Sequence, residues 1–304
     1  MSNILQHLIS KHILPQDTPA TVLSEAADHL TFHIPIQHVL QDIQKEYPHL
    51  DIQQSITSHH TQMPKHPSIK NIIAIASGKG GVGKSTATYF LAHALTHMGA
   101  KVGVLDADIY GPSQALMFDI TSKPETNEQK NFLPFKRQGI EIMSIGVLAN
   151  SDKALMWRGP MISQALLQLY QKTQWGCLDY LLIDLPPGTG DISLTLLQKI
   201  PTTCGVLINY PHILAQMDVD RCKSLFNHLS TPVIGTILNM ASWECPISPN
   251  TQPDLSVPFD QKFQDFKNTL HPEYISIAES LTQRLLALKH YQHNPFADIP
   301  VSKE

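Results

Sequence analysis

The sequence has little of what marks secreted or membrane-spanning proteins. Its 304 residues contain four cysteines, Cys177, Cys204, Cys222 and Cys245, without the paired spacing of a disulfide framework. No apolar run approaches the roughly 20 residues that span a bilayer. The first residues, Met1 to Leu14, lack a basic segment followed by an apolar core, so we expect no signal peptide. These absences predict a cytoplasmic protein that does not enter a membrane.

An excess of basic side chains is also absent. The formal net charge is −4 and the isoelectric point lies near 6.4. Proteins that hold nucleic acid through its phosphates need a basic surface, so we expect no nucleic-acid partner. The 16 histidines are scattered without ligand spacing and are interpreted as solvated surface residues. A hydrophobic content of 42% is enough for a sizeable core.

The most informative stretch begins at Asn71 and ends at Thr86. The apolar run 72–76 predicts a buried parallel strand, and apolar residues at helical spacing follow between residues 87 and 98. Between them lies the pattern Gly78-x-x-x-x-Gly83-Lys-Ser. A strand, this pattern and a helix in succession are the phosphate-binding loop in its required context. An unliganded glycine-rich turn is the alternative that these flanks disfavour.

The residue types of this loop match the chemistry of a nucleoside triphosphate. Glycines let the backbone turn its N–H groups around an anion, and the helix N-terminus adds its dipole. Lys84 is predicted to neutralise the β- and γ-phosphates of ATP, and the Ser85 hydroxyl to bind Mg²⁺. The predicted nucleotide-binding residues of the loop are Gly78, Lys79, Gly80, Gly81, Val82, Gly83, Lys84, Ser85 and Thr86.

Two further apolar runs end in carboxylates. The run 101–106 leads into Asp106 and Asp108, and the run 180–184 ends at Asp184. Carboxylates at the carboxyl edge of a parallel sheet lie where ligands bind. Asp108 is predicted to hold or polarise the attacking water and Asp106 to orient the loop, whereas structural capping is the alternative for both. Asp184 is predicted to hold a Mg²⁺-bound water, with a mobile loop after it at residues 185–191.

The order of the patterns predicts an α/β fold, a mostly parallel sheet flanked by helices. We expect a small α+β module at 1–64, an ATPase domain at 65–290 and a tail at 291–304. Residues 121–138 are polar and are interpreted as a surface loop, and the helix at 277–290 as core packing rather than a membrane anchor. Strands are expected at 203–209 and 233–238. Asn239 follows the second, where its amide would read the adenine edge or form an ordinary turn.

Four motifs occurring together in order resemble the Mrp/ApbC-type ATPases, the bacterial iron–sulfur cluster carriers. The resemblance covers roughly residues 65–245. The motifs are Gly-Lys-Gly-Gly-Val-Gly-Lys-Ser-Thr at 78–86, Asp-Ala-Asp-Ile-Tyr-Gly-Pro-Ser at 106–113, Trp-Arg-Gly-Pro-Met at 157–161 and Asp-Leu-Pro-Pro-Gly-Thr-Gly-Asp at 184–191.

The first motif also resembles the deviant Walker A loop of the MinD/ParA/nitrogenase-iron-protein class. That resemblance implies an ATP-hydrolysing homodimer in which Lys79 reaches across to the partner's nucleotide. Lys79, Lys84 and Asp108 are therefore the predicted catalytic residues. The carrier resemblance implies transfer of a cluster to apo iron–sulfur proteins or other assembly factors.

The sequence departs from the carrier pattern after Asn239. The family has Cys-x-x-Cys at this point, whereas this chain has Cys245 and then Ser248. Serine is a poor iron ligand at neutral pH because its alkoxide is far less accessible than a thiolate. Cys245 is thus the one predicted cluster ligand of this motif. The alternatives left open are a nucleotide-switched positioning protein resembling MinD/ParA and a regulatory ATPase that carries no cluster.

Overall fold

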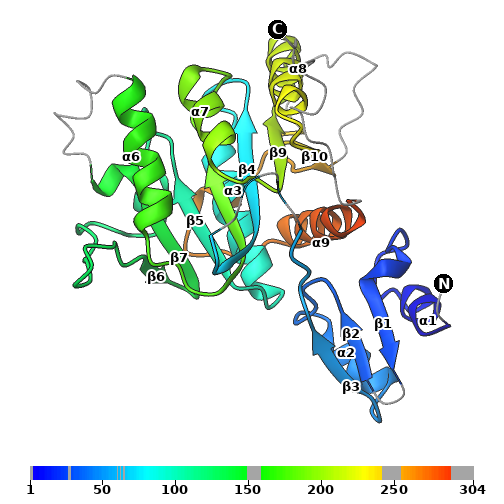
Figure 1. Ribbon diagram of the computed structural model, residues 1–304. Helices are drawn as coiled ribbons and strands as arrows, with labels where there is room; N and C mark the ends of the chain where they lie inside the picture. Colours follow the sequence, from blue (N-terminus) through cyan, green and yellow to red (C-terminus); the bar gives the residue numbers. More distant parts are fainter. Residues whose placement is uncertain are drawn as a thin grey trace, which may run out of the picture.

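The described part of the chain forms two β-sheets, a large one and a small one near the N-terminus (Figure 1). In the computed structural model the described residues are 3–26, 29–59, 61, 63, 66–148, 159–241 and 255–288. The predicted tail at 291–304, together with Trp157, Cys245 and Ser248, lies outside them.

The larger sheet confirms the predicted α/β class. Within the described residues its strand order is β11-β10-β9-β4-β8-β5-β7-β6, and every pairing is parallel except β6 with β7. The strands are β4 (Ile69–Ser77), β5 (Val102–Asp106), β6 (Phe135–Arg137), β7 (Ile140–Ser144), β8 (Leu178–Asp184), β9 (Cys204–Asn209), β10 (Val233–Leu238) and β11 (Leu255–Ser256).

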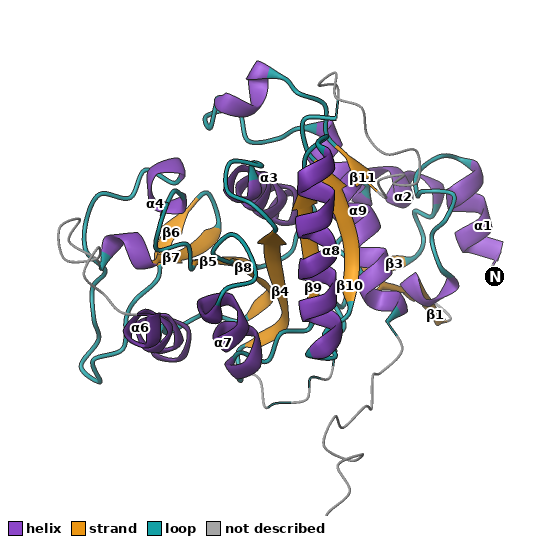
Figure 2. Ribbon diagram, turned by 90° about the horizontal axis from the view of Figure 1, so that it is seen from above, coloured by secondary structure: helices purple, strands orange, loops and turns teal. Residues whose placement is uncertain are grey.

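Helices cover both faces of this sheet, which explains why its central strands carry buried apolar side chains on both faces (Figure 2). One core lies between the sheet and the helices α3 (Lys84–His97) and α9 (Pro272–Ala287). The other lies between the sheet and α6 (Gly159–Lys172), α7 (Asp191–Lys199) and α8 (Ile213–His228). Strand β4 sits between β8 and β9, so the loop that follows it opens at the middle of the sheet.

The N-terminal module, residues 1–64, has a core of its own. Its sheet pairs β1 with β2 antiparallel and β2 with β3 parallel. The elements are α1 (Asn3–Ser10), η1 (Ala20–Val22), β1 (Leu23–Ala26), β2 (His29–Phe32), α2 (Leu40–Glu46) and β3 (Asp51–Gln54). The division of the chain at residue 64 stays a prediction.

The module contacts the end of α3 and one side of α9. The Gln37 N–H donates to the Met98 carbonyl at 2.9 Å, just past the end of α3. The ring of His38 bonds the Glu279 carboxylate of α9 at 2.6 Å. Helix α3 therefore begins at the glycine-rich loop and ends against the module.

The structure differs from expectation in the segment 121–138. Strand β6 occupies its end, because residues 135–137 pair antiparallel with β7 at the sheet edge. Helix α9 packs as predicted, with Leu281 and Leu285 buried. No helix in the described part of the chain is both long and apolar enough to cross a membrane.

The interpretation of the histidines as surface residues is wrong for His59, His93 and His271, which are buried. His93 and His271 lie among aromatic rings. His93 packs edge-on against Tyr89 with ring centroids 4.5 Å apart, and His271 against Phe90 at 4.7 Å. The scattered spacing concealed this, since α3 and the segment before α9 meet only in the folded chain. Within the described ranges, no three His, Cys, Asp or Glu side chains are arranged so that they could hold a metal ion by themselves.

The buried imidazole of His93 predicts a loss of stability in acid. Burial lowers the pKa of His93 to about 4, so the unfolded chain binds more protons below its ordinary value of 6.5. Stability is complete above that value and falls as the pH drops towards 4. The free energy of unfolding, measured by chemical denaturation, should decrease between pH 7 and pH 5 by about 2 kcal/mol less in His93→Leu than in the wild type. His271, whose pKa burial also lowers, stays in both proteins. Equal decreases in the two proteins would contradict the assignment.

Candidate functional site

The glycine-rich loop joins β4 to α3 in a conformation that depends on glycine. Gly81 and Gly83 have φ values of +80° and +83°, in the left-handed region that side chains disfavour. A Cβ on Gly83 would also overlap the Asn239 amide, and one on Gly78 would overlap Asp218 of α8. The loop is thus packed between the end of β10 and one side of α8.

Neighbouring loops fasten this loop at its backbone. The Gly188 N–H donates to the Ser77 carbonyl at 2.8 Å, which connects the loop after β8 to the end of β4. The Asn239 amide donates to the Val82 carbonyl at 2.9 Å. Asn239 therefore contacts the glycine-rich loop, and its role towards adenine stays a prediction.

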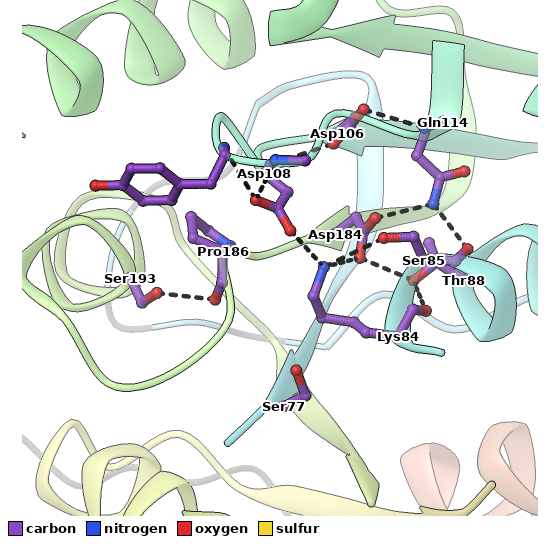
Figure 3. Close-up of polar contacts among 12 residues, drawn as sticks. Ser77, Lys84, Ser85, Thr88, Asp106, Asp108, Gln114, Asp184, Pro186 and Ser193 are labelled. Atoms are coloured by element: carbon purple, nitrogen blue, oxygen red, sulfur yellow. Dashed lines mark hydrogen bonds and ion pairs between the residues drawn. The ribbon is translucent and has the colours of Figure 1, made fainter. Parts of the chain in front are cut away.

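Strand order brings the predicted carboxylates together. Asp106 and Asp184 are direct neighbours at the ends of β5 and β8. Lys84, the first residue of α3, places its ammonium 2.6 Å from Asp184 Oδ1 and 3.6 Å from Asp108 Oδ2 (Figure 3). Lys84 is 5% exposed and Asp184 is fully buried, so this ion pair is shielded from water.

The charges at this site are strongly coupled. Burial acts to lower the pKa of Lys84, but the carboxylates of Asp184, Asp108 and Asp106 outweigh it and raise that pKa. Burial and the neighbouring charge of Asp184 raise the pKa of Asp106 to about 7, against the opposing effects of the Ser144 hydrogen bond and the Lys84 charge. Lys84 is therefore the cation that stabilises the negative charge of this group of carboxylates.

Asp108 also shapes the loop that follows it. Its Oδ1 accepts the N–H groups of Tyr110 and Gly111, each at 3.2 Å. Its other oxygen faces Lys84. Lys79 lies within the glycine-rich loop, where it is half-buried and outside the Lys84 network.

Three buried residues that the sequence reasoning did not select complete the site. Thr88 donates to Asp184 at 3.3 Å, Ser144 to Asp106 at 2.8 Å, and Gln114 to Asp184 at 2.9 Å. Helical spacing could have identified Thr88, since it lies one turn after Lys84. Ser144 and Gln114 reach the site only through strand order and the four-residue helix α4 (Gln114–Met117).

The donor set suits Mg²⁺ and phosphate. The Ser85 hydroxyl and the Asp184 carboxylate are hard oxygen donors of the kind that Mg²⁺ takes. Space above Gly81 is open, since a Cβ there would meet no atom within 4 Å. The described cysteines form no comparable centre: Cys177 is exposed, Cys204 and Cys222 are buried, and burial raises the pKa of Cys222 to about 11.

Comparison with known families decides the relationship. The profile of a ParA-type family described as the NUBPL iron-transfer P-loop NTPase matches residues 68–270 of this chain. The chain belongs to this family. The predicted resemblance to iron–sulfur carrier ATPases is thereby confirmed at the level of the family.

Individual NUBPL-type relatives agree with the profile. An iron-sulfur cluster carrier protein of Pseudomonas fragi is 50% identical over 186 residues, which are 60% of this chain and 65% of that protein. The iron-sulfur cluster transfer protein NUBPL of Dictyostelium discoideum is 46% identical over 180 residues, 59% of this chain and 56% of that protein. The chain thus spans between about half and two thirds of the length of the curated relatives it matches.

Solved structures show the same fold. A nucleotide-binding protein from Archaeoglobus fulgidus in complex with ADP is 31% identical, with a TM-score of 0.55 over 72% of this chain and 89% of that one. MinD from Pyrococcus horikoshii, complexed with Mg-ADP, is 20% identical with a TM-score of 0.54, over 70% of this chain and 94% of that one. The second likeness shows the fold alone.

Proposed function

We propose that this NUBPL-family chain binds and hydrolyses ATP as a homodimer and takes part in iron–sulfur cluster transfer. One observation carries the ATPase part of the proposal. Lys84 lies at the start of α3, buried between Asp184 and Asp108, directly after a loop whose glycines adopt left-handed conformations. A buried cation beside inward-turned N–H groups suits an anionic ligand.

Each group of the site has a separate role in the proposed ATP binding and hydrolysis. Loop N–H groups bind phosphate oxygens, and Lys84 exchanges Asp184 for the β- and γ-phosphates. Once released from Lys84, Asp184 would hold a water bound to Mg²⁺ and the Ser85 hydroxyl would bind the ion, which would supply charge neutralisation during phosphoryl transfer. Asp108, anchored by the Tyr110 and Gly111 N–H groups, orients the attacking water. Asn239, whose amide donates to the Val82 carbonyl, would read the adenine edge.

Replacing the buried lysine tests the ATPase. In Lys84→Ala, ATP hydrolysis should fall by roughly 100-fold or more in kcat/KM, because the developing charge loses its closest cation. ATP affinity should fall as well, as titration calorimetry would show. Lys45→Ala provides the matched control, since Lys45 is exposed and pairs with Asp42 on the N-terminal module. Unchanged turnover in Lys84→Ala would rule out this site.

A homodimer is supported by the position of Lys79 and by exposed apolar side chains beside the loop. Tyr110 and Met217 are 74% and 54% exposed. Tyr110 follows Asp108, and Met217 precedes the α8 residue that contacts Gly78. Apolar groups in such positions are typical of an interaction surface. We propose that two chains meet on this face, with each Lys79 reaching the partner's nucleotide.

Mixing two inactive variants tests this arrangement. If Lys79 acts across the interface, Lys79→Ala and Asp108→Ala should each be inactive alone. An equimolar mixture of the two variants should recover roughly a quarter of the wild-type ATPase rate. About half of the dimers are then mixed, and each mixed dimer has one intact composite site out of two. Subunit exchange is verified with differently tagged chains. Under proven exchange, no recovery over either parent would contradict action in trans.

The cluster-transfer part of the proposal rests on the family and on Cys245. A two-fold axis would bring together two Cys245 thiolates, whereas a [4Fe–4S] cluster ordinarily takes four. We therefore propose that the cluster is a labile cargo, completed by exogenous thiol or by cysteines of partner proteins. Those partners are apo iron–sulfur proteins or other assembly factors.

Anaerobic reconstitution with iron and sulfide tests the role of Cys245. Bound iron per protomer should depend on added thiol and disappear in Cys245→Ser, while ATP affinity stays unchanged. Cys177→Ser, which alters an exposed thiol at the opposite end of β8 from Asp184, should bind iron as the wild type does. A stable stoichiometric cluster that survives Cys245→Ser would show that other ligands hold it.

A further inference from the structure

Gln114 is a fully buried polar residue next to the metal-binding carboxylate of the proposed site. Its side-chain nitrogen donates to Asp184 Oδ2 at 2.9 Å and to the Ser85 carbonyl at 2.9 Å. Its backbone N–H donates to Asp106 Oδ2 at 3.2 Å. One residue therefore bonds to β5, β8 and the first turn of α3 (Figure 3).

The orientation of this amide follows from its partners. The Asp184 carboxylate and the Ser85 carbonyl are both acceptors, so only the NH₂ group of the amide can face them. The Oε1 atom is buried without a hydrogen-bond partner among the described residues. An unsatisfied buried acceptor is costly, and the site retains it in order to present two donors to Asp184 and Ser85.

Gln114 limits how the Asp184 carboxylate can turn. Lys84 and Thr88 both donate to Oδ1 of Asp184, and Gln114 donates to Oδ2. A carboxylate offers about four acceptor positions, so the Gln114 bond leaves one lone pair of Oδ2 for a metal-bound water. When Lys84 moves to phosphate, Gln114 remains as the closer donor to this carboxylate, because Thr88 shares its single hydroxyl proton with the Lys84 carbonyl at 3.0 Å.

Gln114 also anchors one end of the loop that carries Asp108. Residues 109–113 separate the two side chains, and both contact the same ion pair, Asp108 through Lys84 and Gln114 through Asp184. A displacement of this loop would therefore change the orientation of the Asp184 carboxylate. Gln114 is thus the residue through which this loop is connected to the Asp184 carboxylate.

We propose that Gln114 is a positioning residue that orients Asp184 for Mg²⁺ and couples its setting to the loop 109–113. The inference deepens the proposed ATPase function and rests on it. Partners that orient a metal ligand generally affect metal affinity by tenfold or more. A residue that merely fills space would affect ATP binding equally with and without Mg²⁺.

The test measures the affinity of the full chain for a fluorescent non-hydrolysable ATP analogue, with Mg²⁺ and with EDTA. Gln114→Met keeps the length of the side chain and removes both donors. It should raise the Mg²⁺ concentration for half-maximal binding roughly tenfold, with little change in EDTA. Gln114→Asn keeps the amide on a shorter side chain. The Mg²⁺ concentration that it needs for half-maximal binding should lie between those of the wild type and of Gln114→Met. If Gln114→Met fails to fold, the comparison of Gln114→Asn with the wild type provides the test.

Leu116→Met is the matched control, because Leu116 lies on the same short helix and is 84% exposed. It should retain the wild-type Mg²⁺ dependence. An unchanged Mg²⁺ dependence in both Gln114 variants, or equal losses with Mg²⁺ and with EDTA, would overturn the inference. Absence of Mg²⁺-dependent binding in the wild-type chain would instead show that the proposed function itself is wrong.

Discussion

The buried contact between Lys84 and Asp184 is the interaction on which the rest of the site depends. Three carboxylates come together at the ends of two neighbouring strands, and Asp106 and Asp184 are fully buried. Without a compensating cation, burial would shift such carboxylates towards their neutral, protonated forms, as the raised pKa of Asp106 shows. Lys84 supplies that cation, and the same ammonium is the proposed partner of the phosphates. In the proposed function, ligand binding is therefore an exchange of the anion that contacts this one lysine.

The architecture explains how this exchange can be communicated. The carboxyl ends of β4, β5 and β8 lie side by side, so the glycine-rich loop, the Asp108 loop and the loop after β8 share one edge of the sheet. Each loop is bonded to a neighbour, through Gly188 to Ser77 and through Gln114 to Asp184. From the other end of α3, hydrogen bonds lead to the N-terminal module. Helix α3 thus connects the glycine-rich loop to the N-terminal module.

Much of the fold could be predicted from the sequence, because long apolar runs such as that of β4 identify buried parallel strands and the glycine pattern identifies the loop. The same reasoning predicted which end of each strand carries Asp108 and Asp184. Gln114 and Ser144 were not predictable, since their contacts depend on strand order and on a helix too short to have a periodic pattern. The burial of His93 was missed because an isolated histidine in an apolar helix has no sequence signal that separates core from surface.

A double-mutant cycle of Lys84→Met and Asp184→Asn tests the central claim most directly. The free energy of unfolding is measured for the wild type, both single variants and the double variant, all without nucleotide. A buried ion pair with the observed 2.6 Å contact should give a coupling of about 3 kcal/mol, the double variant being less destabilised than the sum of the singles. A coupling below about 0.5 kcal/mol would contradict the account, because Lys84 would then not be the cation that holds the carboxylates together.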